Sequence, residues 1–385
     1  MTRTALSIGI AGAGLLGRLL AWRLAQVGYR VSAFDISTGP EAVPRSRAPE
    51  PYVPTAAGFT AAGMLSPLSE LDSAEPRVAA LGWRSLALWP RIAAALPGRP
   101  NVSVLGSVLL AHGADLGAAQ RVLDRLQAAV HSDIWQRVSP TEPVRALNTQ
   151  ELRALEPSIE GPTHGWLLPG EGHIDTVATM DALYAAAAGV DWRWSSCVVG
   201  IDAGERGGTL RFADGKARAF DAVIDVRGVG AKPDLPVRGV RGEVIWLALP
   251  HHGLRRPVRL LHPRHKVYLV PRTPDIVLVG ASEIESEDRS PVSLRTAVEL
   301  MAAAHSIMPA LAEARILKLD VNLRPALPDN NPRVDLAPHF LRINGLFRHG
   351  WLLSAALVDQ ALRDTSWCPE GLELNDEPAH AGALP

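Results

Sequence analysis

The fold is decided by the stretch from Leu6 to Asp35, which reads LSIGIAGAGLLGRLLAWRLAQVGYRVSAFD. Residues 6–11 are short and apolar, and residues 15–27 carry helical periodicity. Gly28 is placed to end that helix, and the residues that follow alternate between polar and apolar up to Asp35. This order predicts a strand, a tight turn, a helix and a second strand.

Three glycines, Gly12, Gly14 and Gly17, form the pattern GxGxxG between the first strand and the helix. The first permits the turn, the second lets a pyrophosphate approach the backbone, and the third lets helix and strand pack closely. Asp35 ends the next strand, where its carboxylate can accept hydrogen bonds from both ribose hydroxyls of an adenosine. The stretch therefore predicts a dinucleotide site without a 2′-phosphate, but it does not separate NAD from FAD.

Composition narrows the class of protein. The 385 residues carry 39 Lys and Arg against 40 Asp and Glu, so they lack the positive excess that nucleic-acid binding requires, and we expect no such partner. We also expect no membrane span, because no window approaches about 18 apolar residues. Arg18 and Arg23 interrupt the uncharged stretch 5–17, which argues against a signal peptide. Cys197 and Cys368 are too few for a disulfide framework, which favours a cytoplasmic location.

Later segments predict a second kind of sheet. Residues 243–248, 265–271 and 276–280 are β-rich runs separated by Pro and Gly, as in an antiparallel sheet. Strand signals at 220–226 and 341–344 lie outside this block and are expected to extend the N-terminal sheet. Helices are expected at residues 77–96, 117–130, 177–188, 293–307 and 351–362. We infer an α/β fold in which an antiparallel-sheet substrate domain is inserted into a nucleotide-binding domain.

The expected domain boundaries follow from these segments. The nucleotide-binding domain is expected to comprise residues 1–75, 165–235 and 322–368, and the substrate domain residues 76–164 and 236–321. Residues 369–385 are polar and are expected to form a loose C-terminal tail. Ser37 to Thr55 is rich in Pro and Arg and predicts a long loop.

Thr55 to Pro67 reads TAAGFTAAGMLSP, a run of small residues around Gly63. Such a run can let the backbone lie against a flat ring system. It can equally form a small-residue helix that packs closely on a neighbour, and the run alone leaves both interpretations open.

Eight motifs together resemble the D-amino-acid oxidase superfamily of flavoproteins, and within it the glycine oxidases that serve thiamine biosynthesis. The motifs are GAGLLG with Asp35, AAGMLSP at 61–67, PGEGHIDT at 169–176, VRGEVI at 240–245, HKVYLVPR at 265–272, VGASEIES at 279–286, NLRPALPDNNPRV at 322–334 and INGLFRHGWLLSAAL at 343–357. The resemblance covers nearly the whole chain. It implies non-covalently bound FAD, held by a Rossmann-like domain of the glutathione-reductase type.

The resemblance also implies roles for individual residues. Beside the three glycines, the positions that match FAD contacts are Leu15, Leu16, Asp35, Ala57, Gly58, Ala62, Gly63, Met64, Val198, Gly228, Leu346, Phe347, Arg348, His349, Gly350, Trp351 and Leu352. Arg324 and Arg348 match contacts to the substrate carboxylate, and Tyr268 matches an aromatic residue of the same pocket.

Physical chemistry supports these roles separately. A planar guanidinium binds a carboxylate through two parallel hydrogen bonds, which a lysine cannot do. Arg324 precedes Pro325, so its backbone is expected to be extended. Gly350 is expected to open the last helix, whose positive end would suit the negative charge of a reduced flavin.

The implied reaction removes two electrons from the α-carbon of glycine or a similar small amino acid, by hydride transfer to flavin N5. The products would be an imine or glyoxylate, ammonia and, from molecular oxygen, hydrogen peroxide, and the reaction would supply thiamine thiazole synthesis. Two alternatives stay open. One is a dehydrogenase of D-amino acids or sarcosine with a non-oxygen acceptor, and the other is a flavoprotein that modifies or assembles a partner protein. Relatives assemble as homo-oligomers, and the oligomeric state of this chain is left open.

Three features depart from the family pattern or from a simple interpretation. The loop 37–55 is longer than usual, and its role is open. Glu283 stands where a relative has an apolar pocket residue; pairing with a nearby cation is favoured over a contact to the substrate amine. The basic cluster Arg255, Arg256, Arg259, His262, Arg264, His265 and Lys266 is interpreted as a solvated sheet edge rather than an acidic-partner site. We expect no metal, because these histidines lack a ligand pattern.

Overall fold

The N-terminal stretch folds as predicted. The protein's computed structural model describes residues 5–41, 55–72, 74–130, 142–161, 163–262 and 266–367. Strand β1 (Ser7–Ala11) pairs in parallel with β2 (Arg30–Phe34), and α1 (Leu15–Gln26) connects them. Gly28 adopts a φ of 83° directly after α1, a conformation that only glycine adopts at little cost.

Strands β1 and β2 belong to a sheet that we call the parallel sheet, with the order β19-β20-β13-β1-β2-β9 among the described residues. Its further strands are β9 (Asp191–Arg193), β13 (Ala222–Asp225), β19 (Arg333–Ala337) and β20 (Phe340–Asn344). Only the edge pair β19 and β20 is antiparallel within it. The two separated strand signals of the sequence therefore join the N-terminal sheet, as predicted.

The central block of the chain forms what we call the large sheet, with the described strands in the order β18-β14-β17-β16-β15-β5-β7-β6. These strands are β5 (Ser107–His112), β6 (Arg145–Leu147), β7 (Thr163–Leu168), β14 (Arg238–Ala248), β15 (Val258–Leu261), β16 (Lys266–Thr273), β17 (Ile276–Gly280) and β18 (Arg315–Ala326). Every pairing is antiparallel except that of β15 with β5. The α/β fold class with an inserted antiparallel sheet is thus confirmed.

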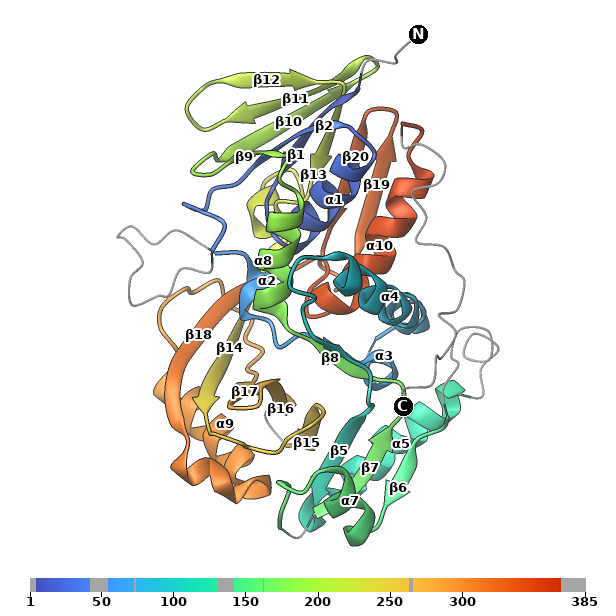
Figure 1. Ribbon diagram of the computed structural model, residues 1–385, viewed down its shortest axis with the longest axis vertical. Helices are drawn as coiled ribbons and strands as arrows, with labels where there is room; N and C mark the ends of the chain where they lie inside the picture. The colour runs from blue at the N-terminus through green and yellow to red at the C-terminus, as the bar shows by residue number, and fades with distance from the viewer. Residues whose placement is uncertain are drawn as a thin grey trace.

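Two smaller antiparallel sheets complete the described strands. One contains β10 (Val198–Gly204), β11 (Gly207–Phe212) and β12 (Ala217–Phe220). The other contains β3 (Met64–Leu65), β4 (Val102–Ser103) and β8 (Gly172–Ile174). In Figure 1 the parallel sheet and β10–β12 occupy the upper half of the molecule, the large sheet curves across the lower half, and β8 runs between them.

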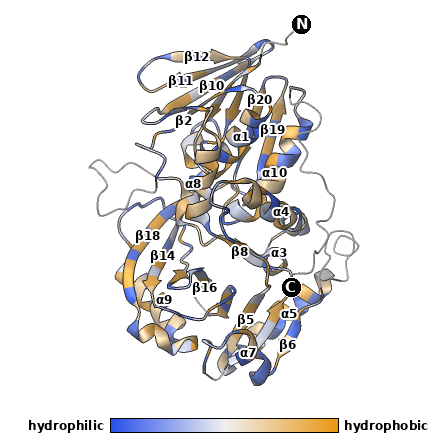
Figure 2. Ribbon diagram, in the orientation of Figure 1, coloured by the Kyte–Doolittle hydropathy of each residue, from blue (hydrophilic) through white to orange (hydrophobic). Residues whose placement is uncertain are grey.

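The described residues form further α-helices in addition to α1. They are α2 (Ala57–Thr60), α3 (Pro67–Glu70), α4 (Pro76–Ala95), α5 (Leu116–Val130), α7 (Thr149–Leu155), α8 (Thr176–Ala186), α9 (Leu294–Ile307) and α10 (Gly350–Asp364). Peripheral helices such as α5 and α7 carry both hydrophilic and hydrophobic residues, as amphipathic elements do (Figure 2). No helix of the described residues is long and apolar enough to cross a membrane.

The predicted domain boundaries do not coincide with the sheets. Helix α4, in the predicted substrate domain, packs on α10, and the Trp89 indole N–H donates to the Trp351 carbonyl over 2.9 Å. Residues 322–326, in the predicted nucleotide-binding domain, belong to β18 of the large sheet. The division into two discontinuous domains stays a proposal, and the predicted tail lies outside the described residues.

Candidate active site

A cavity of about 540 Å³ is lined by residues from both the parallel sheet and the large sheet. It contains every predicted cofactor-binding and catalytic residue except Gly17 and Val198. Gly17 acts instead in the packing of α1, described below. Val198 is buried against Ala11 and Phe34, and its carbonyl accepts a hydrogen bond from the Arg227 guanidinium over 3.2 Å.

The three glycines of the first turn have distinct surroundings. Gly12 has a φ of 105°, and a Cβ there would lie 2.6 Å from the Val226 carbonyl oxygen. A Cβ on Gly17 would lie 1.9 Å from the Gly12 carbonyl oxygen, so only glycine allows α1 to approach the turn this closely. A Cβ on Gly14 would meet nothing nearer than the Ala56 Cβ, 3.6 Å away. The face of Gly14 is therefore open to the cavity.

In the same cavity, Arg324 extends from β18 over the backbone of Gly242 in β14. A Cβ on Gly242 would lie 2.4 Å from the Arg324 guanidinium, so the glycine provides the space for that side chain. The guanidinium donates to the carbonyls of Arg241 (3.3 Å) and Ser282 (3.1 Å). None of the described carboxylates forms an ion pair with Arg324.

Tyr268 lies beside Arg324 and, like Arg324, packs over a glycine of a neighbouring strand. It lies over Gly280 of the neighbouring strand β17, where a Cβ would be 2.6 Å from the phenol. Burial raises the pKa of Tyr268, although the charge of Arg324 opposes that shift. The phenol is therefore neutral at physiological pH and can donate a hydrogen bond toward a group held by Arg324.

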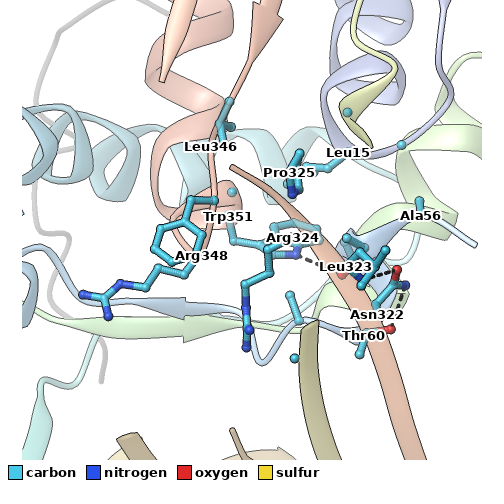
Figure 3. Close-up of a pocket in the computed structure, with 18 of the residues that line it drawn as sticks. Leu15, Ala56, Thr60, Asn322, Leu323, Arg324, Pro325, Leu346, Arg348 and Trp351 are labelled. Carbon is cyan, nitrogen blue, oxygen red and sulfur yellow. Dashed lines mark hydrogen bonds between the residues drawn. The ribbon is translucent and has the colours of Figure 1, made fainter. Parts of the chain in front are cut away.

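Arg348 lines the same cavity but is already paired. Its Nη2 lies 2.6 Å from Glu70 Oε2, and its Nη1 lies 3.6 Å from Glu283 Oε2. Figure 3 shows the guanidinium groups of Arg324 and Arg348 pointing in different directions. The predicted pair of arginines thus shares one cavity, and Arg348 would have to leave Glu70 to meet the carboxylate that Arg324 holds. The contact of Glu283 is the cation pairing that the sequence favours.

Comparison with known proteins identifies the family to which the chain belongs. A family model described as FAD dependent oxidoreductase (DAO) matches residues 7–359. This chain belongs to that FAD-dependent oxidoreductase family. It is 35% identical over 360 residues to the "Putative thiamine biosynthesis oxidoreductase ThiO" of Rhizobium etli, covering 92% of this chain and 94% of that protein.

Glycine oxidase of Geobacillus kaustophilus is 25% identical over 368 residues, 90% of this chain and 89% of that protein. Its crystal structure superposes with a TM-score of 0.75 at 24% identity, covering 97% of this chain and all of that one. The iminodiacetate oxidase of Chelativorans sp. BNC1 also has a TM-score of 0.75, at 20% identity, covering 93% and 95% of the two chains. These two structural matches show the fold of the family.

The residues of this FAD-dependent oxidoreductase fit the cofactor of its family. The open face of Gly14 lies at the N-terminus of α1, whose free N–H groups and positive dipole end suit a pyrophosphate. Asp35 accepts hydrogen bonds from the Ala13 N–H (2.6 Å) and from the Ser37 N–H (2.8 Å) and hydroxyl (2.6 Å). These bonds orient its carboxylate at the cavity wall, where the ribose of FAD would meet it.

The small-residue run supports the cavity wall with backbone. Residues 57–60 are helical and Pro67 begins α3, and the chain between them extends through Gly63, whose φ is 75°. A Cβ on Gly63 would lie 2.3 Å from the Ile174 carbonyl oxygen. Buried Arg272 donates to the carbonyls of Ala61 (2.7 Å) and Ile174 (2.8 Å), and so ties the run to the large sheet. The extended backbone lines the cavity, in agreement with the flat-ring interpretation.

Helix α10 begins at Gly350, as predicted, and its first residues line the cavity. The N-cap residue His349 is buried, and burial lowers its pKa. The charge of Glu70 opposes this shift, and the charge of Arg348 adds to it. A neutral imidazole leaves the positive end of the helix dipole as the local electrostatic feature. That end would stabilise negative charge on the bound FAD.

Sequence reasoning did not identify several residues in and beside the cavity as part of the site. Four of them, Glu70, Arg259, Gly242 and Asn322, line the cavity, and Gly280 lies against Tyr268. Their roles depend on contacts between segments that are distant in the sequence. The Asn322 amide donates to the Thr55 carbonyl and the Thr60 hydroxyl, both over 3.2 Å, and so joins β18 to the small-residue run. The glycines of VRGEVI and VGASEIES were the available signal for Gly242 and Gly280.

The basic cluster is not simply a solvated edge. Arg256 is 8% exposed and pairs with Glu156 over 3.0 Å, and Arg259 and Lys266 line the cavity. The solvated-edge interpretation was wrong for Arg256, because its charge is matched inside the protein. Arg264 and His265, and most of the predicted loop 37–55, lie outside the described residues. The described part of the chain contains no cluster of three or more side chains suited to a metal.

Proposed function

We propose that this protein oxidises glycine or a similar small amino acid at the α-carbon, with FAD as the electron acceptor. The observation that carries the proposal is the Arg324 guanidinium, which lines the cavity over Gly242, lacks a described carboxylate partner and lies beside the neutral phenol of Tyr268. A guanidinium and a phenol offer the donors that an amino-acid carboxylate accepts. The family membership supplies the cofactor.

The proposed residue roles concern binding and orientation. Arg324 would hold the substrate carboxylate through two parallel hydrogen bonds, and Tyr268 would donate a third. Gly242 and Gly280 keep these two side chains in place, since any larger residue would displace them. Fixing the carboxylate orients the α-carbon, and such alignment supplies a large part of the rate in reactions that need no protein acid or base.

Arg348 is proposed to place a second positive charge at the cavity wall, where Glu70 holds it. Burial raises the pKa of Glu70, but nearby positive charge, which includes that of Arg348, outweighs burial and holds that pKa below its usual range. The ionised Glu70 keeps the Arg348 side chain at the cavity wall. Its predicted direct contact with the substrate would require exchange of Glu70 for the substrate carboxylate.

FAD, when bound, would supply the acceptor for the hydride that leaves the α-carbon, with molecular oxygen as the final oxidant that becomes hydrogen peroxide. The substrate becomes an imine, which water hydrolyses to glyoxylate and ammonia when the substrate is glycine. The similarity to the Rhizobium etli protein supports a supply of this product to thiamine thiazole synthesis. We retain the cytoplasmic location as part of this proposal.

The experiment is a mass balance in air. Purified protein with FAD is given glycine, and oxygen uptake, peroxide, glyoxylate and ammonia are measured. The proposal predicts equal amounts of all four. Glycine consumption that needs an added quinone and forms no peroxide would support the dehydrogenase alternative instead. A control with Arg324→Met reports whether the activity depends on the proposed site.

A further inference from the structure

Arg259 is a cavity residue to which the proposed reaction gives no role. It lies on β15, directly opposite Tyr268 of β16 in the antiparallel register, so both side chains project from the same face of the large sheet. Both line the cavity. Tyr268 also lies beside Arg324, and this one phenol is close enough to both arginines for their charges to lower its pKa against the effect of burial. The cavity therefore presents guanidinium groups next to the same tyrosine.

The guanidinium of Arg259 has no hydrogen bond or ion pair with any residue that the structure describes, and its Nε is buried without a partner among them. Other arginines of the basic cluster and of the cavity do have carboxylate partners. Arg256 pairs with Glu156, and Arg348 pairs with Glu70 and Glu283. Buried guanidinium nitrogens without partners are costly and rare, so this one calls for an acceptor that enters from the cavity.

Two nearby carboxyl groups do not serve as that acceptor. Glu70 is engaged by Arg348 at 2.6 Å. Glu171 accepts from the Ser69 N–H (2.7 Å) and hydroxyl (3.1 Å) and from the Ser107 hydroxyl (2.5 Å), and burial raises its pKa. Burial therefore favours the neutral form of Glu171. The charge of Arg259 acts on both carboxyl groups, but neither of them accepts a hydrogen bond from its guanidinium. The N–H groups of Arg259 are therefore open to a ligand.

We propose that Arg259 binds a second carboxylate of the substrate, so that the preferred substrates are small amino acids with two carboxylate groups. The inference rests on the proposed function, in which Arg324 holds the first carboxylate. The second carboxylate would accept the N–H groups of Arg259 on the other side of Tyr268. Glycine remains a substrate, because it needs only Arg324 and Tyr268.

The kinetic test compares substrates that differ by one carboxylate. Iminodiacetate is compared with sarcosine, and D-aspartate with D-alanine, in wild-type protein, Arg259→Met and Arg259→Lys. We expect kcat/KM to favour the dicarboxylate in at least one pair. Arg259→Met should lower that value by about thirtyfold or more, as loss of a buried charged hydrogen bond does. Arg259→Met should change kcat/KM for glycine less than threefold. For the dicarboxylate, kcat/KM of Arg259→Lys should lie between the values of wild type and Arg259→Met.

A binding measurement keeps the test independent of turnover. Malonate and acetate are titrated into the FAD-loaded protein, and the shift of the visible flavin spectrum reports their binding. We expect malonate to bind more tightly than acetate, and Arg259→Met to abolish the difference. Arg255→Met is the matched control, because it removes the same charge from an exposed position outside the cavity lining. It should keep the wild-type preference.

The outcomes separate the two proposals. One outcome is that no amino acid reduces the flavin but malonate still binds more tightly to the wild-type protein than to Arg259→Met. In that case the proposed reaction fails and the second carboxylate site stands. If the wild-type protein has no preference for dicarboxylates, the site is refuted. It is equally refuted if Arg259→Met weakens monocarboxylates and dicarboxylates alike, since Arg259 would then act only as a general positive charge. FAD content and thermal unfolding confirm that each variant is folded.

Discussion

Arg324 shows how far a residue's role can be predicted from sequence. Its place before Pro325 predicts an extended backbone, and the resemblance assigns it to the substrate; the structure has it in β18. What the sequence could not show is that Gly242, on the adjacent strand, makes room for its guanidinium. Arg259 was misinterpreted for the same reason, because it meets Tyr268 only through the register of β15 and β16.

Replacement of Arg324 by Met should lower kcat/KM for glycine by an amount equivalent to about 2 to 5 kcal/mol, the usual cost of losing a buried charged contact. Steady-state kinetics measure the change. FAD content should stay at the wild-type level, since Arg324 is proposed to contact the substrate. An unchanged KM and kcat would remove Arg324 from the site.

Two glycine variants should separate catalysis from folding. In Gly242→Ala the new methyl meets the end of a flexible side chain 2.4 Å away, so Arg324 must shift while the backbone can stay. We expect FAD to remain bound and kcat/KM for glycine to fall by roughly tenfold to a hundredfold.

Gly17→Ala should behave in the opposite way. Its methyl would meet a backbone oxygen at 1.9 Å, so α1 must move. We expect a loss of stability of about 1–3 kcal/mol or more, together with weakened FAD binding. Denaturant unfolding and flavin absorbance measure both. Equal FAD content and equal stability in the two variants would contradict this account of the turn.

At the scale of elements, long periodic segments were predictable and short ones were not. The helices 293–307 and 351–362 carry 3.6-residue periodicity and form α9 and α10 nearly as expected. Strands β3, β4 and β8 have two or three residues each, too few for any local pattern. They exist because distant segments pair around β8, which joins the small-residue run to the rest of the protein.

The pairing around β8 should depend on pH through His173, which is buried in that strand. Burial, and then the charge of Arg272, lower the pKa of His173 from 6.5 to about 4. Between these values the unfolded chain binds the proton and the folded protein does not. The free energy of unfolding should therefore be fully retained above pH 6.5 and decrease toward pH 4, by up to about 1.4 kcal/mol per pH unit.

Denaturant unfolding at pH 7 and pH 5 measures this decrease. His173→Gln removes the titrating group and should flatten the dependence, whereas His305→Gln, which replaces an exposed histidine of α9, should keep it. The same slope in wild type and His173→Gln would show that another group is responsible.

At the scale of the whole molecule, the cavity joins the two sheets. Gly12 and Asp35 contribute to it from the parallel sheet, and Tyr268 and Arg324 from the large sheet. A βαβ opening in the sequence predicts the first half of this arrangement. The second half depends on where the inserted sheet packs, which no local pattern determines.

Because FAD would contact residues of both halves, it should stabilise the protein as one unit. FAD at a hundredfold excess over its dissociation constant adds about 2.7 kcal/mol to the free energy of unfolding. Calorimetry of the apoprotein with and without FAD should show a single transition that moves to higher temperature. Two transitions, of which FAD shifts only one, would contradict a site shared by both sheets.

The most direct measurement is the visible absorbance of the FAD-loaded protein before and after glycine is added without oxygen. The account predicts that the yellow flavin bleaches, and that its colour returns when air is admitted and peroxide forms. A flavin that stays oxidised with glycine and with every other small amino acid would contradict the claim that Arg324 and Tyr268 present such a substrate to the cofactor.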